Sequence, residues 1–326
     1  MQKKDKKILI TGHLGFIGFH LAKRLIHEGH EIMGIDSLNN YYSQKLKKDR
    51  GKVLDGINGN YFSKIEDISN EEIIKTLKQF KPDIIVNLAA QAGVRHSLDH
   101  PEDYVSNNIS SFLNIIKYAK DYGVEKIIYA STSSVYGGNT DFPFSENDRV
   151  DNPLQFYAVT KRTNELMANA YNDLYKISFI GLRFFTVYGP WGRPDMSIHK
   201  FTNLIINNKP IDVFNYGKHS RDFTYIDDVV EGISLVSLKK NKYLSNSYSE
   251  IYNIGGDHPI TLNNLIKEIE KNLGKKAKRN LMPLQMGDVK KTISNIKKIK
   301  KHYGFSPKTS INEGIKSFID WYKSYY

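Results

Sequence analysis

The sequence predicts an α/β protein built on a doubly wound parallel sheet, with a smaller α/β domain toward the C-terminus. Over the first half of the chain, short apolar runs rich in β-branched residues alternate with longer segments of helical periodicity. A glycine-rich turn follows the first of these runs. The chain has 326 residues, enough for about two domains. Such alternation is typical of a parallel sheet with helices on both faces.

The elements of the first half follow one another as strand and helix. We expect strands at residues 7–11, 31–36, 59–63, 83–88, 126–131 and 178–184, and helices at residues 16–28, 70–80, 103–122 and 156–175. Gly29 and Gly123 follow two of the helix ends, where a left-handed C-cap favours glycine. The crossover connections should be right-handed.

The pattern changes after residue 188. The run from Gly189 to Pro194 is typical of a loop, and the apolar runs beyond it are shorter and more widely spaced. We therefore expect a first domain over residues 1–188 and a second, mainly substrate-binding domain over residues 189–326. Residues 222–250 should pack back on the first domain.

Composition excludes several classes of function. The chain contains no cysteine, which excludes thiolate nucleophiles and thiolate metal sites, and we expect no metal. Its net charge of +12 comes from lysines that are scattered and not interleaved with aromatics, so we expect no nucleic-acid partner. No apolar run approaches the roughly 18 residues that indicate a membrane-spanning helix. We expect a cytoplasmic protein without a membrane partner.

The turn after the first strand carries a nucleotide-binding pattern. Gly12, Gly15 and Gly18 lie between the strand and the first helix, where glycines let the backbone approach a pyrophosphate. Asp36 ends the second strand, where a carboxylate accepts hydrogen bonds from the ribose of NAD and repels the 2′-phosphate of NADP. Glycines required only for packing are the alternative interpretation. The pattern predicts a Rossmann-type domain that binds NAD.

A second pattern indicates acid–base chemistry. Tyr157 and Lys161 are four residues apart on a predicted helix, hence on one face. An ammonium near a phenol should lower the pKa of the phenol from about 10, so Tyr157 could act as a base on an alcohol. Four consecutive hydroxyl residues, 131–134, end the fifth strand, where parallel sheets bind ligands. Capping of a turn explains one or two of these hydroxyls better than four.

Together with these motifs, longer runs resemble a known family. The chain resembles the NAD-dependent epimerase/dehydratase family of extended short-chain dehydrogenases/reductases, and is most similar to the UDP-glucuronate 4-epimerases. The matching runs are residues 88–95, 131–137, 182–196, 221–228 and 285–289. Two positions depart from the family pattern: Asn87 replaces a usual His, and His96 replaces a usual Tyr.

The resemblance implies roles for individual residues. Thr132, Tyr157 and Lys161 would form the catalytic set. The residues implied to bind NAD are Gly12, Gly15, Phe16, Ile17, Gly18, Asp36, Asn40, Asp67, Ile68, Leu88, Ala89, Gln91, Asn107, Tyr157 and Lys161. Those expected to bind the UDP-sugar are Arg95, Ser133, Ser134, Thr186, Arg193, Arg221, Gln285 and Asp288. Helices 103–122 and 156–175 would pair with their copies in a homodimeric four-helix bundle.

The family catalyses several reactions, and the residues after Thr132 favour one. Related dehydratases carry Asp-Glu there and related decarboxylases carry Glu before Val-Tyr-Gly, whereas this chain has Ser133 and Ser134. We expect isomerisation of UDP-glucuronate to UDP-galacturonate for polysaccharide biosynthesis: hydride leaves C4, the 4-keto sugar rotates, and hydride returns from tightly bound NAD. The alternatives are a 4-epimerase of UDP-glucose or UDP-N-acetylglucosamine, a UDP-glucuronate decarboxylase, and a non-catalytic NAD-binding sensor.

Overall fold

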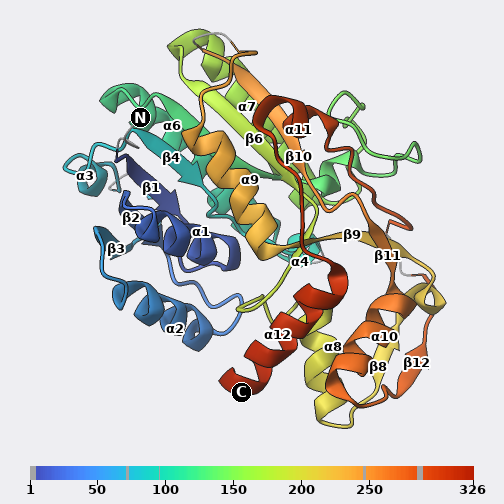
Figure 1. Cartoon of the computed structure of the whole chain (residues 1–326). Coiled ribbons are helices and arrows are strands. Elements are labelled where there is room, and N and C mark those ends of the chain that lie inside the picture. Colours follow the sequence, from blue (N-terminus) through green and yellow to red (C-terminus); the bar gives the residue numbers. More distant parts are fainter. Residues whose placement is uncertain (1–4, 71–72, 95, 245–246, 285–288) are drawn as a thin grey trace.

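The computed structural model describes residues 5–70, 73–94, 96–244, 247–284 and 289–326. Within these residues a seven-stranded parallel sheet forms the centre of the molecule, as predicted (Figure 1). Its strand order is β10-β6-β5-β4-β1-β2-β3, so the winding reverses between β1 and β4. Open α/β sheets bind ligands at such a switch point, beyond the carboxyl ends of the strands. The bounds are β1 (Lys7–Thr11), β2 (Glu31–Asp36), β3 (Tyr61–Ile65), β4 (Ile84–Asn87), β5 (Lys126–Thr132), β6 (Ser178–Phe184) and β10 (Ser249–Ile254).

Helices cover both faces of this sheet (Figure 1). Side chains alternate along β1, so Ile8 and Ile10 enter one apolar cluster and Leu9 enters the other. Helices α1, α2 and α9 contribute to the first cluster, and α3, α6 and α7 to the second. Their bounds are α1 (Phe16–His27), α2 (Gln44–Asp55), α3 (Ile73–Leu77), α6 (Ser111–Tyr122), α7 (Phe156–Tyr175) and α9 (Ile226–Leu238).

The later part of the chain both rejoins this sheet and builds smaller ones. Helix α9 packs against α1, and β10 pairs with β6. A three-stranded sheet has the order β11-β9-β7, and β12 pairs with β8. The domain boundary near residue 189 stays a prediction. The remaining strands are β7 (Thr186–Tyr188), β8 (Ile211–Val213), β9 (Ser220–Tyr225), β11 (Pro259–Thr261) and β12 (Arg279–Leu281); the later helices are α8 (Ser197–Ile206), α10 (Leu262–Leu273), α11 (Lys297–Tyr303) and α12 (Ile311–Tyr325).

Three elements differ from the sequence-based expectation. Helix α2 was not expected, because two cations, Lys47 and Arg50, interrupt its apolar stripe and are nevertheless buried. The predicted third strand lies two residues later, after Gly59 has packed against Ile26. The predicted helix 103–122 is divided into α5 (Pro101–Tyr104), a π-helical turn (Val105–Ser110) and α6. The shorter helical segments are α4 (His96–Asp99) and two 3₁₀ turns (Ser133–Tyr136 and Phe214–Gly217).

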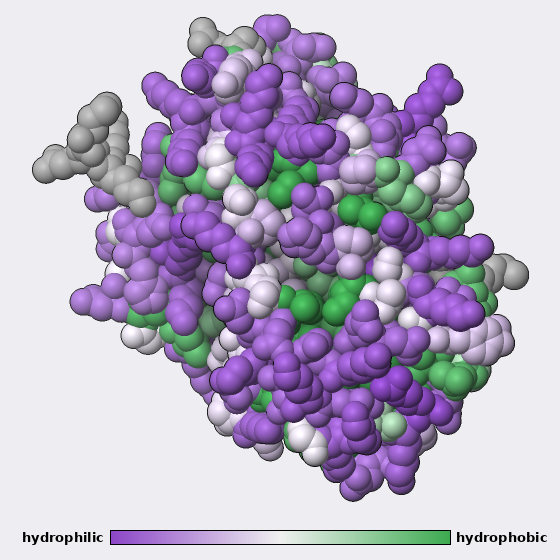
Figure 2. Space-filling view, turned by 45° about the vertical axis from the view of Figure 1, so that its right-hand side comes forward, coloured by the Kyte–Doolittle hydropathy of each residue, from purple (hydrophilic) through white to green (hydrophobic). Residues whose placement is uncertain are grey.

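The face of the molecule seen in Figure 2 is mainly polar. Hydrophilic side chains cover most of the face seen in Figure 2, and hydrophobic ones gather in small patches. Among the described helices, none combines the length and the apolar character that crossing a membrane requires.

Candidate active site

A cavity of about 800 Å³ lies at the switch point of the sheet and reaches into the later part of the chain. Most predicted site residues line it, namely Gly12, Gly15, Phe16, Ile17, Gly18, Asp36, Asp67, Ile68, Leu88, Ala89, Gln91, Asn107, Thr132, Ser133, Ser134, Tyr157, Lys161, Thr186, Arg193 and Arg221. Asn40 is exposed and lies outside this lining, which its neighbour Asn39 joins instead. Arg95, Gln285 and Asp288 lie outside the described residues, so their contacts stay predictions.

The glycine-rich turn at one end of the cavity has no room for side chains. Gly12 has a φ of +71°, and a Cβ there would lie 2.8 Å from the backbone nitrogen of Ala89. A Cβ on Gly18 would lie 2.1 Å from the carbonyl oxygen of Gly12. Gly15 is the N-cap of α1 and offers no side-chain cap, which leaves the first N–H groups of a twelve-residue helix to an anion. The turn therefore fits a pyrophosphate.

Asp36 is fixed in orientation beside this turn. It ends β2 and is 8% exposed. The backbone N–H of Leu38 donates to its Oδ1 at 2.8 Å, and that of Leu14 donates to its Oδ2 at 3.3 Å. Each carboxylate oxygen keeps a further lone pair for a donor such as a ribose hydroxyl. The Asp36 carboxylate therefore fits the ribose of NAD.

Sequence reasoning missed a cation on the wall of the cavity. Lys47 lines the cavity and is only 5% exposed. Its Nζ donates to Oδ1 of Asn39 at 2.6 Å and to the backbone oxygen of Asn39 at 2.9 Å. It also lies 4.8 Å from the ring centroid of Tyr42. The helical spacing of Leu46, Val53 and Leu54 was the available signal for this helix, but no local pattern marks one lysine of many as buried.

The proposed catalytic side chains meet between β5 and α7. Thr132 ends β5, and Tyr157 and Lys161 lie on the first turns of α7. Burial raises the pKa of the Tyr157 phenol above its usual value, while the Arg193 charge and a hydrogen bond with Thr132 partly oppose this. Burial lowers the pKa of Lys161 to about 8. The expected lowering of the Tyr157 pKa by Lys161 is therefore wrong for this structure, because burial of the phenol outweighs the nearby charges.

The hydroxyl groups of residues 131–134, at the end of β5 and just beyond it, differ in their contacts. Thr132 caps the following 3₁₀ turn, since its Oγ1 accepts from the backbone N–H of Ser134 at 3.2 Å and donates to Ser134 Oγ at 3.2 Å. Ser131 instead donates to Oε1 of Glu165 on α7 at 2.6 Å. Capping therefore accounts for part of this run, while Ser133 and Ser134 line the cavity.

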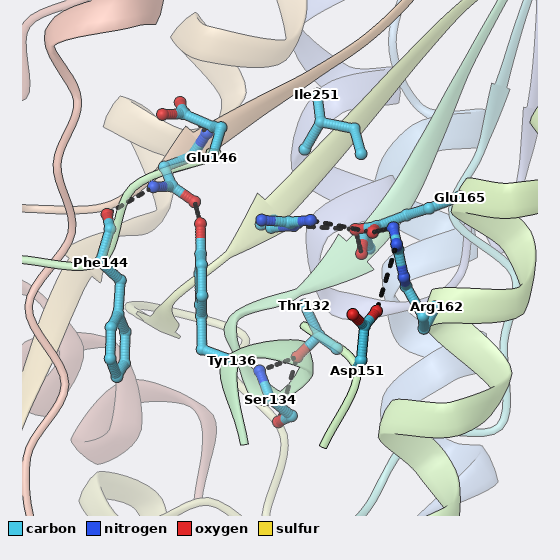
Figure 3. A network of polar contacts seen from close by, with 12 residues as sticks. Thr132, Ser134, Tyr136, Phe144, Glu146, Asp151, Arg162, Glu165 and Ile251 are labelled. Carbon is cyan, nitrogen blue, oxygen red and sulfur yellow. Dashed lines mark hydrogen bonds and ion pairs between the residues drawn. The ribbon is translucent and has the colours of Figure 1, made fainter. Parts of the chain in front are cut away.

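Glu165 is the centre of a buried polar network behind the cavity (Figure 3). Arg183 on β6 donates to both its carboxylate oxygens, from Nε and Nη2, at 2.9 Å each. Arg162 donates to Glu165 at 3.1 Å, and the two side chains point toward each other in Figure 3. Because Tyr157, Lys161 and Glu165 follow one another at four-residue spacing, the network anchors the same helix face that carries the proposed catalytic pair.

Arg193 is a second arginine that lines the cavity, in addition to Arg221. Its Nε donates to Asp195 Oδ1 at 3.0 Å and its Nη2 to Asp195 Oδ2 at 2.5 Å. Its guanidinium lies 5.6 Å from the ring centroid of Tyr41, which also packs 5.1 Å from the ring of His96. His96 lines the cavity, whereas Asn87 is buried in β4 and accepts from Thr11 at 2.7 Å. Of the two departures from the family pattern, only His96 faces the site.

Known proteins resemble this chain in sequence and in fold. The profile of the NAD dependent epimerase/dehydratase family matches residues 8–255. Protein CapI of Staphylococcus aureus is 48% identical, over 98% of this chain and 99% of its own. A probable UDP-glucuronate 4-epimerase of Rhizobium meliloti is 41% identical, over 98% of each. The crystal structure of UDP-glucuronic acid 4-epimerase from Bacillus cereus, in complex with UDP-glucuronic acid and NAD, superposes with a TM-score of 0.91 at 34% identity, covering 98% of this chain and 100% of that one.

Proposed function

We propose that this chain, which belongs to the NAD dependent epimerase/dehydratase family, interconverts UDP-glucuronate and UDP-galacturonate by inverting C4. Its relatives support the broader assignment to the NAD-dependent UDP-sugar 4-epimerases, which are isomerases. The observation that carries the narrower proposal is Arg193, a cation on the wall of the same cavity as Tyr157. A guanidinium is suited to bind the 6-carboxylate of a uronate by two hydrogen bonds.

The described residues fit NAD. The free N-terminus of α1 and the close-packed glycines accommodate a pyrophosphate, and the oriented carboxylate of Asp36 accepts from a ribose. Lys47 adds a positive charge to the same end of the cavity. When bound, NAD supplies the hydride acceptor, and later the hydride donor, at C4 of the sugar.

Tyr157 is the proposed base and acid at O4 of the sugar. Its phenolate would take the O4 proton as the sugar is oxidised and return that proton when C4 is reduced from the opposite face, so no net proton or hydride is consumed. In the ligand-free protein its pKa is raised by burial. Positive charge near the phenol stabilises the phenolate, so Lys161 and the cationic nicotinamide ring would favour the active form.

The other residues near Thr132 disfavour competing reactions. Ser133 and Ser134 carry no carboxylate to act as the acid or base of a dehydration. A 4-keto uronate is a β-keto acid, which loses CO2 readily once its carboxylate leaves the ring plane. We propose that Arg193, with Thr186, Ser133 and Ser134, holds the carboxylate and so retains CO2.

Turnover of the purified holoenzyme with UDP-glucuronate tests the proposal. NMR should show inversion at C4 with C6 retained, without added NAD and without net NADH. A UDP-pentose product would instead assign a decarboxylase. Turnover of UDP-glucose or UDP-N-acetylglucosamine in preference to UDP-glucuronate would assign a neutral-sugar epimerase. Binding of NAD without turnover of any of these three UDP-sugars would favour the alternative of a non-catalytic NAD-binding sensor.

We also propose that the chain forms a homodimer through α6 and α7. Val159, Leu166 and Leu174 are 38%, 55% and 69% exposed and follow α7 at seven- to eight-residue spacing, hence on one stripe. An apolar stripe of this kind suits a helix that packs against a second copy. Light scattering should give the mass of a dimer, and Leu166→Glu should shift it to that of a monomer; an unchanged mass would contradict this interface.

A further inference from the structure

Arg50 on α2 is a buried cation that spans two loops of the active site. Its side chain is 0% exposed. Nη1 donates to the carbonyl oxygen of Leu14, in the glycine-rich turn, and to the hydroxyl of Tyr42, each at 2.7 Å. Nη2 donates to the carbonyl oxygen of Trp191 at 2.5 Å. Leu14 and Trp191 are 177 positions apart in the sequence, and one guanidinium holds both backbones.

No carboxylate among the described residues neutralises Arg50, although its guanidinium lies 5.6 Å from the ring centroid of Tyr42. Among the described residues no carboxylate oxygen forms an ion pair with this guanidinium, and its Nε has no hydrogen-bond partner. Burial of a guanidinium without a counter-ion destabilises a fold, and a leucine or methionine would fill the same space without that cost. The hydrogen bonds to the two loops are therefore what arginine provides at this position and leucine or methionine would not.

The second loop needs such a restraint. Trp191 has a φ of +61°, a backbone conformation that residues other than glycine rarely adopt. Its carbonyl is held by Arg50, and the carbonyl of the preceding Pro190 hydrogen-bonds the ring of His20 on α1 at 2.9 Å. Arg193, the proposed carboxylate ligand, follows two residues later. The position of Arg193 thus depends on contacts with the NAD-binding part of the molecule.

We propose that Arg50 is a positioning residue that couples NAD binding to UDP-sugar binding. Occupation of the glycine-rich turn by a pyrophosphate fixes the Leu14 backbone, and the shared guanidinium then fixes the Trp191 backbone and the Arg193 loop. By thermodynamic linkage the sugar must strengthen NAD binding by the same factor. The inference rests on the proposed binding of NAD and a UDP-sugar, and it assigns a means by which NAD stays bound during turnover.

Release of NAD from the holoenzyme reports this coupling once the rate of NAD rebinding is measured under the same conditions, because the linkage holds for the equilibrium affinity and not for a single rate constant. The half-time of NAD release is recorded with and without saturating UDP-glucuronate, and the ratio of the two is compared between variants. We expect UDP-glucuronate to slow release by about tenfold or more in the unaltered protein. In Arg50→Lys the ratio should fall to about threefold or less, because an ammonium keeps the charge but cannot span the same acceptors. Its KM for UDP-glucuronate should rise about tenfold while kcat stays within about threefold.

Leu54→Ala is the matched control. Leu54 lies one turn further along α2, is 0% exposed and belongs to the apolar core. Its truncation should lower the melting temperature but leave the release ratio unchanged. If the ratio is unchanged in Arg50→Lys, falls equally in Leu54→Ala, or equals one in the unaltered protein, the proposal is wrong. Should Arg50→Lys fail to fold, Tyr42→Phe is the alternative variant, because it removes one of the three acceptors of Arg50. It should halve the ratio of the NAD-release half-times, and an unchanged ratio in this variant would also show that the proposal is wrong.

The outcome separates this inference from the proposed function. If the unaltered protein does not bind UDP-glucuronate, the proposed substrate is wrong, and the same release measurements with UDP-glucose decide the role of Arg50. If it binds and epimerises UDP-glucuronate while the ratio is insensitive to Arg50, only the coupling is wrong.

Discussion

Replacement of Glu165 by glutamine should strongly destabilise the protein. Gln keeps the size of the side chain but removes the charge and replaces one acceptor oxygen with an N–H donor. Four hydrogen bonds end on the carboxylate, from Ser131, Arg162 and, twice, Arg183. Arg183 is 1% exposed, so the substitution leaves a buried guanidinium without its counter-ion.

The size of the effect follows from this burial. Loss of one partner from a buried ion pair costs about 3–5 kcal/mol, against a total stability of about 5–15 kcal/mol. The contact with Arg162 adds little, because that side chain is 28% exposed and screened by water. Loss of both charges together is far less costly than loss of one. Glu165→Gln combined with Arg183→Met should therefore lie within about 2 kcal/mol of the unaltered protein.

Urea unfolding at a fixed, saturating NAD concentration measures these differences, provided that the m-value stays constant. The four proteins of the double-mutant cycle should give a coupling energy of at least about 4 kcal/mol between Glu165 and Arg183, because each single loss costs about 3–5 kcal/mol and the double variant lies within about 2 kcal/mol. In the folded fraction kcat should fall, by up to about a hundredfold for a displacement near 1 Å, because the network anchors the helix that carries Tyr157. A loss below about 1 kcal/mol for Glu165→Gln, or strictly additive effects, would refute this account of the network.

Further predictions concern the cavity itself. Tyr157→Phe should lose kcat by several orders of magnitude while its NAD content, measured after denaturation, stays near one per chain; near-normal turnover would exclude Tyr157 as the base. Arg193→Ala should raise KM for UDP-glucuronate and release a UDP-pentose detectable by NMR, and unchanged kinetics would remove Arg193 from the carboxylate site. Burial lowers the pKa of Lys161 from 10.5 to about 8. Between these two pH values the unfolded chain binds one more proton at Lys161 than the folded protein does. The NAD-free protein should therefore gain stability as the pH rises from 8 to 10.5. Lys161→Met should abolish that pH dependence and stabilise the NAD-free protein at pH 7 by about 3 kcal/mol, measured by urea unfolding. A destabilised Lys161→Met protein would contradict this account of Lys161. Gly18→Ala should lose NAD, because its Cβ would lie 2.1 Å from the Gly12 carbonyl oxygen; full NAD retention would argue against the tight turn.

The fold was predictable where burial leaves a local signature. Strands β1, β2 and β6 begin and end where the sequence predicts, because each is an apolar run buried on both faces of the sheet. Helix α2 had only the weak signature of a few spaced apolar residues, since two of its inward positions are Lys47 and Arg50. Lys47 donates to Asn39 in the preceding loop, and Arg50 donates to the distant backbone carbonyls of Leu14 and Trp191, contacts that no local pattern reveals.

In the candidate site, too, the sequence predicts what depends on local spacing and not what depends on contacts with distant residues. The four-residue spacing places Tyr157 and Lys161 on one helix face, and both line the cavity. Spacing does not report how deeply the phenol is buried, and that burial reverses the expected direction of its pKa. Likewise the sequence indicates Arg193 but not its pairing with Asp195, a carboxylate with which the proposed uronate carboxylate would have to share Arg193, or which it would have to displace.

The buried cations explain where the positive charge of this chain acts. Lys47, Arg50 and Lys161 are 5%, 0% and 2% exposed, and none forms an ion pair with a carboxylate among the described residues. Arg183, which is not part of the cavity lining, is instead neutralised by Glu165. Unpaired buried cations are costly in the ligand-free protein, and for Lys47 and Lys161, which line the cavity, the proposed NAD and UDP-sugar would bring counter-charges. Bound ligands should therefore stabilise this protein more than contact area alone would predict, and the gain should grow with ligand concentration as mass action requires.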